Sequence, residues 1–191
     1  AATVLRWRLL DPAGAGPVRL RVRPFLSGRD YHLLQHENPL FHMTPEANDA
    51  GWTWTSYPDV PAVHALTNGR YLHAPQWYRQ FLYPAEHDRG LDDTEDLAAP
   101  GEFLWDLTAR DATLIWTTEA TTMLGVERDP ERLSDVLTGR EATRRAARTP
   151  HQLATEQFLV HRDGGATIIA GYPWFTDWGR DTFIALRGLC L

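Results

Sequence analysis

Two tryptophans, an arginine and two aspartates lie within the short segment Tyr172–Asp181. Arg180 carries a rigid fork of N–H donors, and the adjacent Asp181 carboxylate can accept hydrogen bonds from two or more hydroxyl groups. Trp174 and Trp178 offer ring faces on which an apolar C–H surface can stack. Because sugars combine hydroxyl groups with apolar C–H faces, we predict that these four side chains line a carbohydrate-binding pocket.

A structural interpretation of the same segment stays open. Asp181 is suited to cap a helix, Arg180 to pair with a nearby carboxylate, and the tryptophans to fill a core. The two interpretations are compatible, since a capping carboxylate can also accept a hydrogen bond from a ligand. Asp177 and Asp181 are four residues apart and form a candidate pair of hydrolytic carboxylates. A single turn, however, rarely places two carboxylates on opposite sides of a sugar, so we predict binding residues here and not catalytic ones.

Two other segments contain side chains that could bind a metal ion. His32 and His36 are four residues apart beside Glu37, but no third ligand follows at a typical spacing, and an Asn-Pro dipeptide would end a helix there. The acidic stretch Glu86–Glu102 lacks the regular alternation of a calcium-binding EF-hand loop. We expect structural hydrogen bonds at the histidines, a solvated acidic loop, and no metal site or other cofactor.

Trp52 and Trp54 alternate with threonines, which places both rings on one face of an extended strand. Such a face is either a sugar-binding platform or half of a hydrophobic core. A sandwich of two sheets needs large inward side chains, so the core interpretation is favoured.

The composition is that of an ordinary globular domain, with 43% hydrophobic and 23% charged residues in a chain of 191. No apolar run reaches the roughly 18 residues of a membrane span, and the N-terminal residues alternate as in a strand and not as in a signal peptide. The net charge of −6 and the lack of a basic run argue against nucleic acid as a partner. A single cysteine, Cys190, suits a reducing compartment, and we expect a cytoplasmic protein.

Short runs of β-branched and aromatic residues, separated by turn residues, predict a mainly β fold built as an antiparallel β-sandwich. Residues 3–10 and 18–26 flank a Pro/Gly-rich turn at 11–17 and together predict a hairpin. Further strands are expected at 52–56, 63–67, 77–83, 102–107 and 112–118.

The pattern changes after about residue 125, where Asp129-Pro130 predicts the start of a helix that continues to about residue 148. A second helix is expected to begin near Pro150, with an apolar stripe over residues 152–160. A turn, a short extended run at 166–170 and an apolar stretch that begins at Asp181 complete the chain.

Three stretches carry a resemblance to a known family. They are Ile168–Leu186 (IIAGYPWFTDWGRDTFIAL), Arg29–Pro39 (RDYHLLQHENP) and Trp77–Phe103 (WYRQFLYPAEHDRGLDDTEDLAAPGEF). The first is similar to the opening of the catalytic domain of bacterial and archaeal glycogen debranching enzymes of the amylo-α-1,6-glucosidase type. The other two resemble the N-terminal domain of the same family.

The resemblance implies an N-terminal β-sandwich at 1–125 that lacks its first strands, a helical linker at 126–149, and the truncated start of a six-hairpin (α/α) barrel at 150–191. The parent enzyme would hydrolyse α-1,6-glucosidic branch linkages, with an α-glucan and the remainder of its own barrel as partners and no metal or cofactor. Similar barrels hold a terminal glucose with a Trp-x-Arg-Asp turn. By this resemblance, the expected substrate-binding residues are Trp178, Arg180 and Asp181, together with Trp174. The catalytic acids are expected beyond residue 191, so this chain alone is expected to be inactive.

Two alternatives remain at this point. One is a stand-alone glucan-binding module that uses the face formed by Trp52 and Trp54. The other is a fragment of a different (α/α)-barrel glycoside hydrolase, glucoamylase-like or trehalase-like.

Overall fold

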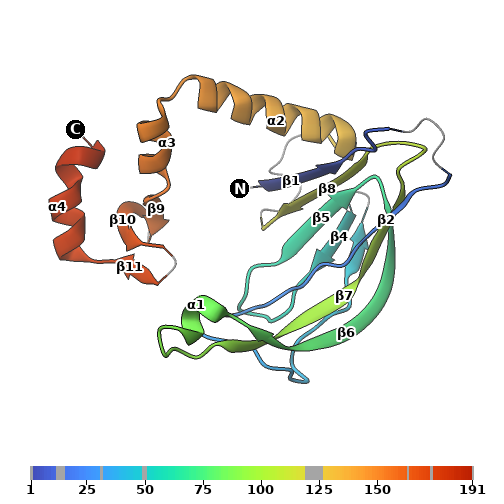
Figure 1. Ribbon diagram of the computed structural model, residues 1–191, viewed down its shortest axis with the longest axis horizontal. Helices are drawn as coiled ribbons and strands as arrows, with labels where there is room; N and C mark the ends of the chain where they lie inside the picture. Colours follow the sequence, from blue (N-terminus) through green and yellow to red (C-terminus); the bar gives the residue numbers. More distant parts are fainter. Residues whose placement is uncertain are drawn as a thin grey trace. The chain divides into compact units, whose positions relative to one another are not determined.

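The computed structural model describes residues 2–11, 16–30, 32–48, 51–118, 127–162, 164–172 and 174–190. The chain forms two compact units, residues 1–138 and 139–191. Figure 1 shows their helices and strands, coloured from the N-terminus in blue to the C-terminus in red. The domain boundary predicted at residue 125, and most of the turn predicted at 11–17, lie outside the described residues.

A five-stranded antiparallel sheet forms one layer of the first unit, in the order β1-β8-β5-β4-β3. Its strands are β1 (Ala2–Trp7), β3 (Glu46–Asn48), β4 (Gly51–Trp54), β5 (Val63–Thr67) and β8 (Ala112–Thr117). Ala65 and Leu114 face one side of this sheet, while Leu66 and Ile115 face the other, as expected for alternating side chains in a strand.

A three-stranded antiparallel sheet, ordered β2-β7-β6, forms the second layer. It consists of β2 (Arg19–Val22), β6 (Arg70–Leu82) and β7 (Thr94–Asp106). The two long strands β6 and β7 pair along most of their length and curve strongly (Figure 1). The pairing is irregular between His73 and Gln76 and again between Tyr78 and Phe81, and such bulges bend a strand.

One aromatic core joins the two sheets. Trp54 of β4 is fully buried, and its ring lies 5.5 Å from that of Tyr71 and 6.4 Å from that of Phe103, both in the opposite sheet. Trp52 packs against the same core, 4.8 Å from Tyr71. Two antiparallel sheets around one core are the arrangement of a β-sandwich, and the core interpretation of Trp52 and Trp54 is confirmed.

The predicted hairpin between residues 3–10 and 18–26 is wrong. Both strands exist, but β1 pairs with β8 and β2 pairs with β7, so the two lie in different sheets. Pro and Gly between two strands indicate a change of direction and do not determine the pairing partner. The intervening segment is also longer than the two-residue loops that hold tight hairpins together.

Only the first part of the acidic stretch at 86–102 is solvated as we expected, since residues 87–92 are exposed. The stretch begins at the end of the short helix α1 (Pro84–His87), and from Thr94 it forms β7, where the side chains of Glu95 and Glu102 are buried. Arginines supply the missing counter-charges: Arg29 binds Glu95, and Arg23 binds Glu102. These partners lie more than 60 residues away in sequence, which is why local composition suggested solvent exposure.

Helix α2 (Pro130–Ala146) begins where the sequence predicts, because the Asp129 carboxylate accepts hydrogen bonds from the backbone N–H groups of Glu131 and Arg132. In the first unit, its Leu133 packs on Leu66 and Ile115, on the face of the five-stranded sheet opposite the aromatic core.

The second unit contains helix α3 (Pro150–Glu156), strands β9 (Leu159–Arg162), β10 (Gly165–Gly171) and β11 (Phe175–Asp177), and helix α4 (Gly179–Cys190). A capping box between Thr149 and Gln152 fixes the predicted start of α3. The helix ends at Glu156, earlier than the predicted stripe to residue 160, because Leu159–Arg162 pairs with β10 as a strand. The three strands form one antiparallel sheet in the order β11-β10-β9.

Candidate functional site

The predicted binding segment lies where β11 passes directly into α4. Trp178 is the single residue between the two elements, and its carbonyl accepts the Thr182 backbone N–H at 2.8 Å. The Thr182 hydroxyl donates to the carbonyl of Ile168 on β10 at 3.4 Å. The first turn of α4 is therefore attached to the neighbouring strand, and we call Trp178–Asp181 the binding turn.

The side chains of the binding turn are open to solvent. Trp178 is 62% exposed, and the side chains of Arg180 and Asp181 are 74% and 40% exposed. Arg180 Nη2 lies 3.3 Å from Asp181 Oδ2, so both charged groups lie together at the start of the helix. This contact uses one of the five N–H donors of the guanidinium, which leaves the others directed at solvent or a ligand.

The structural interpretation of the segment is therefore only partly correct. Trp178 is not a core residue, and Asp181 lies inside the first helical turn and not in the position before it. A carboxylate in that turn is favoured by the partial positive charge of the helix N-terminus. Trp174 differs from Trp178, because it is partly buried and offers less of its ring to a ligand.

Asp177 has a different environment from Asp181, although it belongs to the same segment. One carboxylate oxygen forms an ion pair with Arg162 on β9, and the other accepts the Thr167 hydroxyl of β10 at 3.1 Å. Because both oxygens are engaged within the protein, Asp177 is not available as a hydrolytic partner of Asp181.

Large apolar side chains surround the binding turn on the surface of the second unit. They are at least 41% exposed, which is unusual for such side chains on adjacent elements. They are Tyr172, Phe175, Phe183, Ile184 and Leu186.

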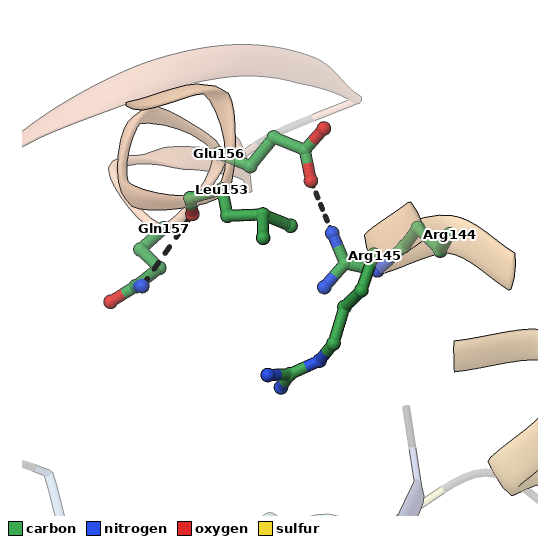
Figure 2. Close-up of a pocket in the computed structure, with 5 residues that line it drawn as sticks. All are labelled: Arg144, Arg145, Leu153, Glu156 and Gln157. Atoms are coloured by element: carbon green, nitrogen blue, oxygen red, sulfur yellow. Dashed lines mark hydrogen bonds and ion pairs between the residues drawn. The ribbon is translucent and has the colours of Figure 1, made fainter. Parts of the chain in front are cut away.

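A separate pocket of about 420 Å³ lies between the end of α2 and α3 (Figure 2). Its charged walls are paired within the protein: Arg144 with Glu156, and Arg145 with Glu141 at 2.6 Å. Hydrogen bonds from Arg144 and then Arg145 lower the pKa of Glu141 to about 2. No residue of the binding turn lines this pocket, and its remaining wall is formed by Leu153 and Gln157.

A buried charge cluster around Glu95 in the first unit could not be predicted from the sequence. Arg29 binds Glu95 with both Nε and Nη2, at 2.5 Å and 2.9 Å, and the Tyr83 hydroxyl donates to Oε2 at 2.5 Å. Burial alone would raise the pKa of Glu95, but the hydrogen bonds from Arg29, Tyr83 and the Gln35 backbone outweigh it and lower the pKa. Every partner of this carboxylate is internal, so the cluster connects the segment around residue 30 to β7.

The residues considered as metal ligands make contacts within the protein, and the backbone N–H of His32 donates to the Asp30 carboxylate at 2.9 Å. His36 lies 3.9 Å from Asp96, and Glu37 forms an ion pair with Arg79. Among the residues that the structure describes, no group of three or more histidine, cysteine or acidic side chains is arranged to hold a metal ion.

Two family models match the chain. One, described as the N-terminal part of the glycogen debranching enzyme, matches residues 1–114, and the other, described as amylo-alpha-1,6-glucosidase, matches residues 153–191. The first match covers more than half of the chain. The chain belongs to the glycogen debranching enzyme family. No curated protein and no solved structure matches it.

The two family matches correspond to the two units of this debranching enzyme chain. The N-terminal match covers β1 to β7 and the first half of β8, and the amylo-alpha-1,6-glucosidase match begins in α3 and includes the binding turn. The predicted relationship is thereby confirmed, and the parent enzyme is a glycoside hydrolase. The matches favour this family over the glucoamylase-like and trehalase-like alternatives.

The alternative of a stand-alone glucan-binding module is contradicted by the burial of its proposed binding face. Trp54 is fully buried and the partly buried Trp52 packs against the same aromatic core, so the face that they form belongs to the interior of the sandwich. Within the described parts of the debranching enzyme chain, no helix has the length and apolar character needed to cross a membrane.

Proposed function

We propose that the binding turn holds a terminal glucose residue of an α-glucan, such as glycogen, limit dextrin or a maltooligosaccharide, in an enzyme that hydrolyses α-1,6 branch linkages. The observation that carries this proposal is the exposure of Trp178, Arg180 and Asp181 at one helix start within the segment that matches amylo-alpha-1,6-glucosidase.

Each side chain of the binding turn supplies one part of sugar recognition. Arg180 donates hydrogen bonds to hydroxyl oxygens, and Asp181 accepts hydroxyl protons, so the pair binds two neighbouring hydroxyl groups together. Trp178 stacks on the C–H face of the glucose ring. Trp174 contributes a smaller contact, because it is partly buried.

Hydrolysis of the glycosidic bond requires two further carboxylates on opposite sides of the scissile bond. Asp177 is engaged by Arg162 and Thr167, and Asp181 is assigned to binding. The resemblance to the family implies a catalytic acid and base beyond residue 191, so in this proposal the 191-residue chain binds glucan without cleaving it.

The exposed apolar side chains of α4 support a barrel architecture for the second unit. Phe183 and Ile184 are 78% and 75% exposed, and a neighbouring helix would remove them from water. In this proposal, the sandwich at 1–125 and the helical linker at 126–149 precede the start of a six-hairpin (α/α) barrel at 150–191, whose remaining helices cover α4. Limited proteolysis within 126–149 that releases two stable fragments would support these boundaries, and preferential cleavage inside the sandwich would contradict them.

A cytoplasmic location completes the proposal. It rests on the single cysteine, which cannot form an internal disulfide and suits a reducing compartment. Cell fractionation that recovers the protein with cytoplasmic enzymes would support this location, and recovery in a secreted fraction would contradict it.

Calorimetric titration of the purified chain with an α-1,6-branched maltooligosaccharide tests the proposed binding. We expect Arg180→Ala to weaken binding by roughly tenfold or more, because the hydrogen bonds that it removes involve a charged donor. Arg140→Ala, at an exposed position of α2, is the matched control and should bind as the wild type does. An unchanged affinity in Arg180→Ala would contradict the proposal, and release of glucose by the wild-type chain would contradict the placement of the catalytic acids.

A further inference from the structure

Asp177 lies where the three-stranded sheet of β9, β10 and β11 meets the start of α4. It is the last residue of β11, pairs across the sheet with Ile169 on β10, and is followed directly by Trp178. A change in its position is therefore transmitted directly to Trp178, the first residue of the binding turn.

The carboxylate of Asp177 connects the two edge strands of the sheet across the central one. Arg162 reaches it from β9, and Thr167 reaches it from β10 at 3.1 Å, although β11 and β9 are not themselves paired. The side chains of Arg162 and Asp177 are 58% and 23% exposed, against 74% and 40% for Arg180 and Asp181, so water screens the first pair less than the second. With Thr182, which attaches α4 to Ile168, this contact fixes the binding turn at both of its ends.

We infer that Asp177, held by Arg162 and Thr167, is a positioning residue for the glucose-binding turn and does not itself contact the ligand. The inference rests on the proposed function, because the turn must bind glucose for its position to matter. Loss of the ion pair would let Trp178 and Arg180 occupy several orientations. Glucan affinity would then fall in proportion to the fraction of molecules whose binding turn is in the orientation that binds glucan.

Titration of the intact chain with the branched maltooligosaccharide tests the inference through three variants. Asp177→Asn and Arg162→Gln should each weaken binding by roughly tenfold, since each removes the ion pair between the two side chains. The double variant should bind glucan as well as the single variant with the lower affinity, because both substitutions remove the same contact. Arg162→Lys keeps the positive charge and should recover part of the affinity.

A control separates positioning from a general loss of structure. Glu141→Gln removes an exposed ion-paired carboxylate of the same unit, away from the binding turn, and should leave affinity unchanged. Unfolding would lower the number of binding sites per chain, whereas mispositioning raises the dissociation constant at unchanged stoichiometry. If Asp177→Asn does not fold, Thr167→Val tests the second contact and should weaken binding in the same way.

The possible outcomes distinguish the two proposals. If the wild type binds glucan and Arg180→Ala weakens it, but Asp177→Asn and Arg162→Gln bind as the wild type does, the positioning role is wrong and the proposed function stands. Additive losses in the double variant would also overturn it. If the wild type does not bind glucan at all, both proposals fail together.

Discussion

Trp54 and Trp178 belong to the two units of one chain and have opposite surroundings. Trp54 is fully buried between two sheets, with aromatic rings from both of them around it. Trp178 is 62% exposed between a strand and a helix, beside an arginine and an aspartate. The residue type alone therefore does not distinguish a core tryptophan from a binding one, and the distinction comes from the strands that cover it.

Two ion pairs, one in each unit, differ in the same way: Arg29 with Glu95 is buried, and Arg180 with Asp181 is exposed. Glu95 accepts hydrogen bonds from Arg29, Tyr83 and the Gln35 backbone and is fully buried. Asp181 and Arg180 contact each other at 3.3 Å and keep most of their hydrogen-bonding capacity open. A saturated buried pair stabilises a fold, whereas an open pair is available to bind a ligand.

The largest expected effect is on stability, from truncation of the two tryptophans. Trp54→Ala should lower the free energy of unfolding by about 3–5 kcal/mol, because it leaves a large cavity in the aromatic core. Trp178→Ala should change it by less than about 0.5 kcal/mol, since it removes an exposed side chain. Urea denaturation followed by circular dichroism measures both free energies. A similar decrease in the two variants would contradict the different surroundings of Trp54 and Trp178.

The next effect concerns the two charged pairs. Glu95→Ala leaves Arg29 and Tyr83 without their shared acceptor and should lower the free energy of unfolding by about 3 kcal/mol. Asp181→Ala should change it by less than about 0.5 kcal/mol, because the pair it breaks is exposed. The same denaturation experiment applies, and a stable Glu95→Ala variant would show that the buried cluster does not stabilise the fold.

A smaller difference is expected between two glycines, one from each unit. A Cβ atom at Gly101 would lie 2.3 Å from the Leu72 carbonyl oxygen, so Gly101→Ala should destabilise the sandwich by about 1–3 kcal/mol. A Cβ atom at Gly179 would meet nothing within 4 Å, and Gly179→Ala should be neutral or stabilising by up to about 1 kcal/mol. Thermal melting of the two variants measures this difference, and equal melting temperatures would contradict the close packing at Gly101.

The smallest effect is a change in the acid dependence of stability. The folded pKa of Glu95 lies below its ordinary value of 4.5, so its ionised form contributes stability above that pH. This contribution is lost as the pH falls from 4.5 through the lowered pKa, because protonation then favours the unfolded chain. Unfolding of Glu95→Gln should depend less on pH in this range, and a slope equal to that of the wild type would assign the acid sensitivity to other groups.

Local features of the fold could be predicted from the sequence, because they depend on neighbouring residues. Alternation of apolar and polar residues predicted the strands, and Asp129-Pro130 and Pro150 predicted two helix starts that side-chain caps confirm. The binding segment was found in the same way, from the density of polar and aromatic residues in Tyr172–Asp181. Its binding role remains a prediction.

Features that depend on distant residues could not be predicted. The partners of β1 and β2 are β8 and β7, which lie far along the chain, and the counter-charge of Glu95 is Arg29. Composition described residues 86–102 correctly as acidic, but only the tertiary fold shows that two of its carboxylates are buried. Likewise, the separate role of Asp177 follows from contacts with Arg162 and Thr167, which the spacing of the aspartates does not reveal.

The indole N–H signals of the eight tryptophans give the most direct test of the central claim, because each reports on its own surroundings. We would assign them by single substitution in a ¹⁵N-labelled chain and titrate the branched maltooligosaccharide. The account predicts that the Trp178 signal shifts and saturates, that Trp174 follows to a smaller extent, and that Trp54 and Trp105 stay unchanged. A shift at the sandwich tryptophans with none at Trp178 would contradict it.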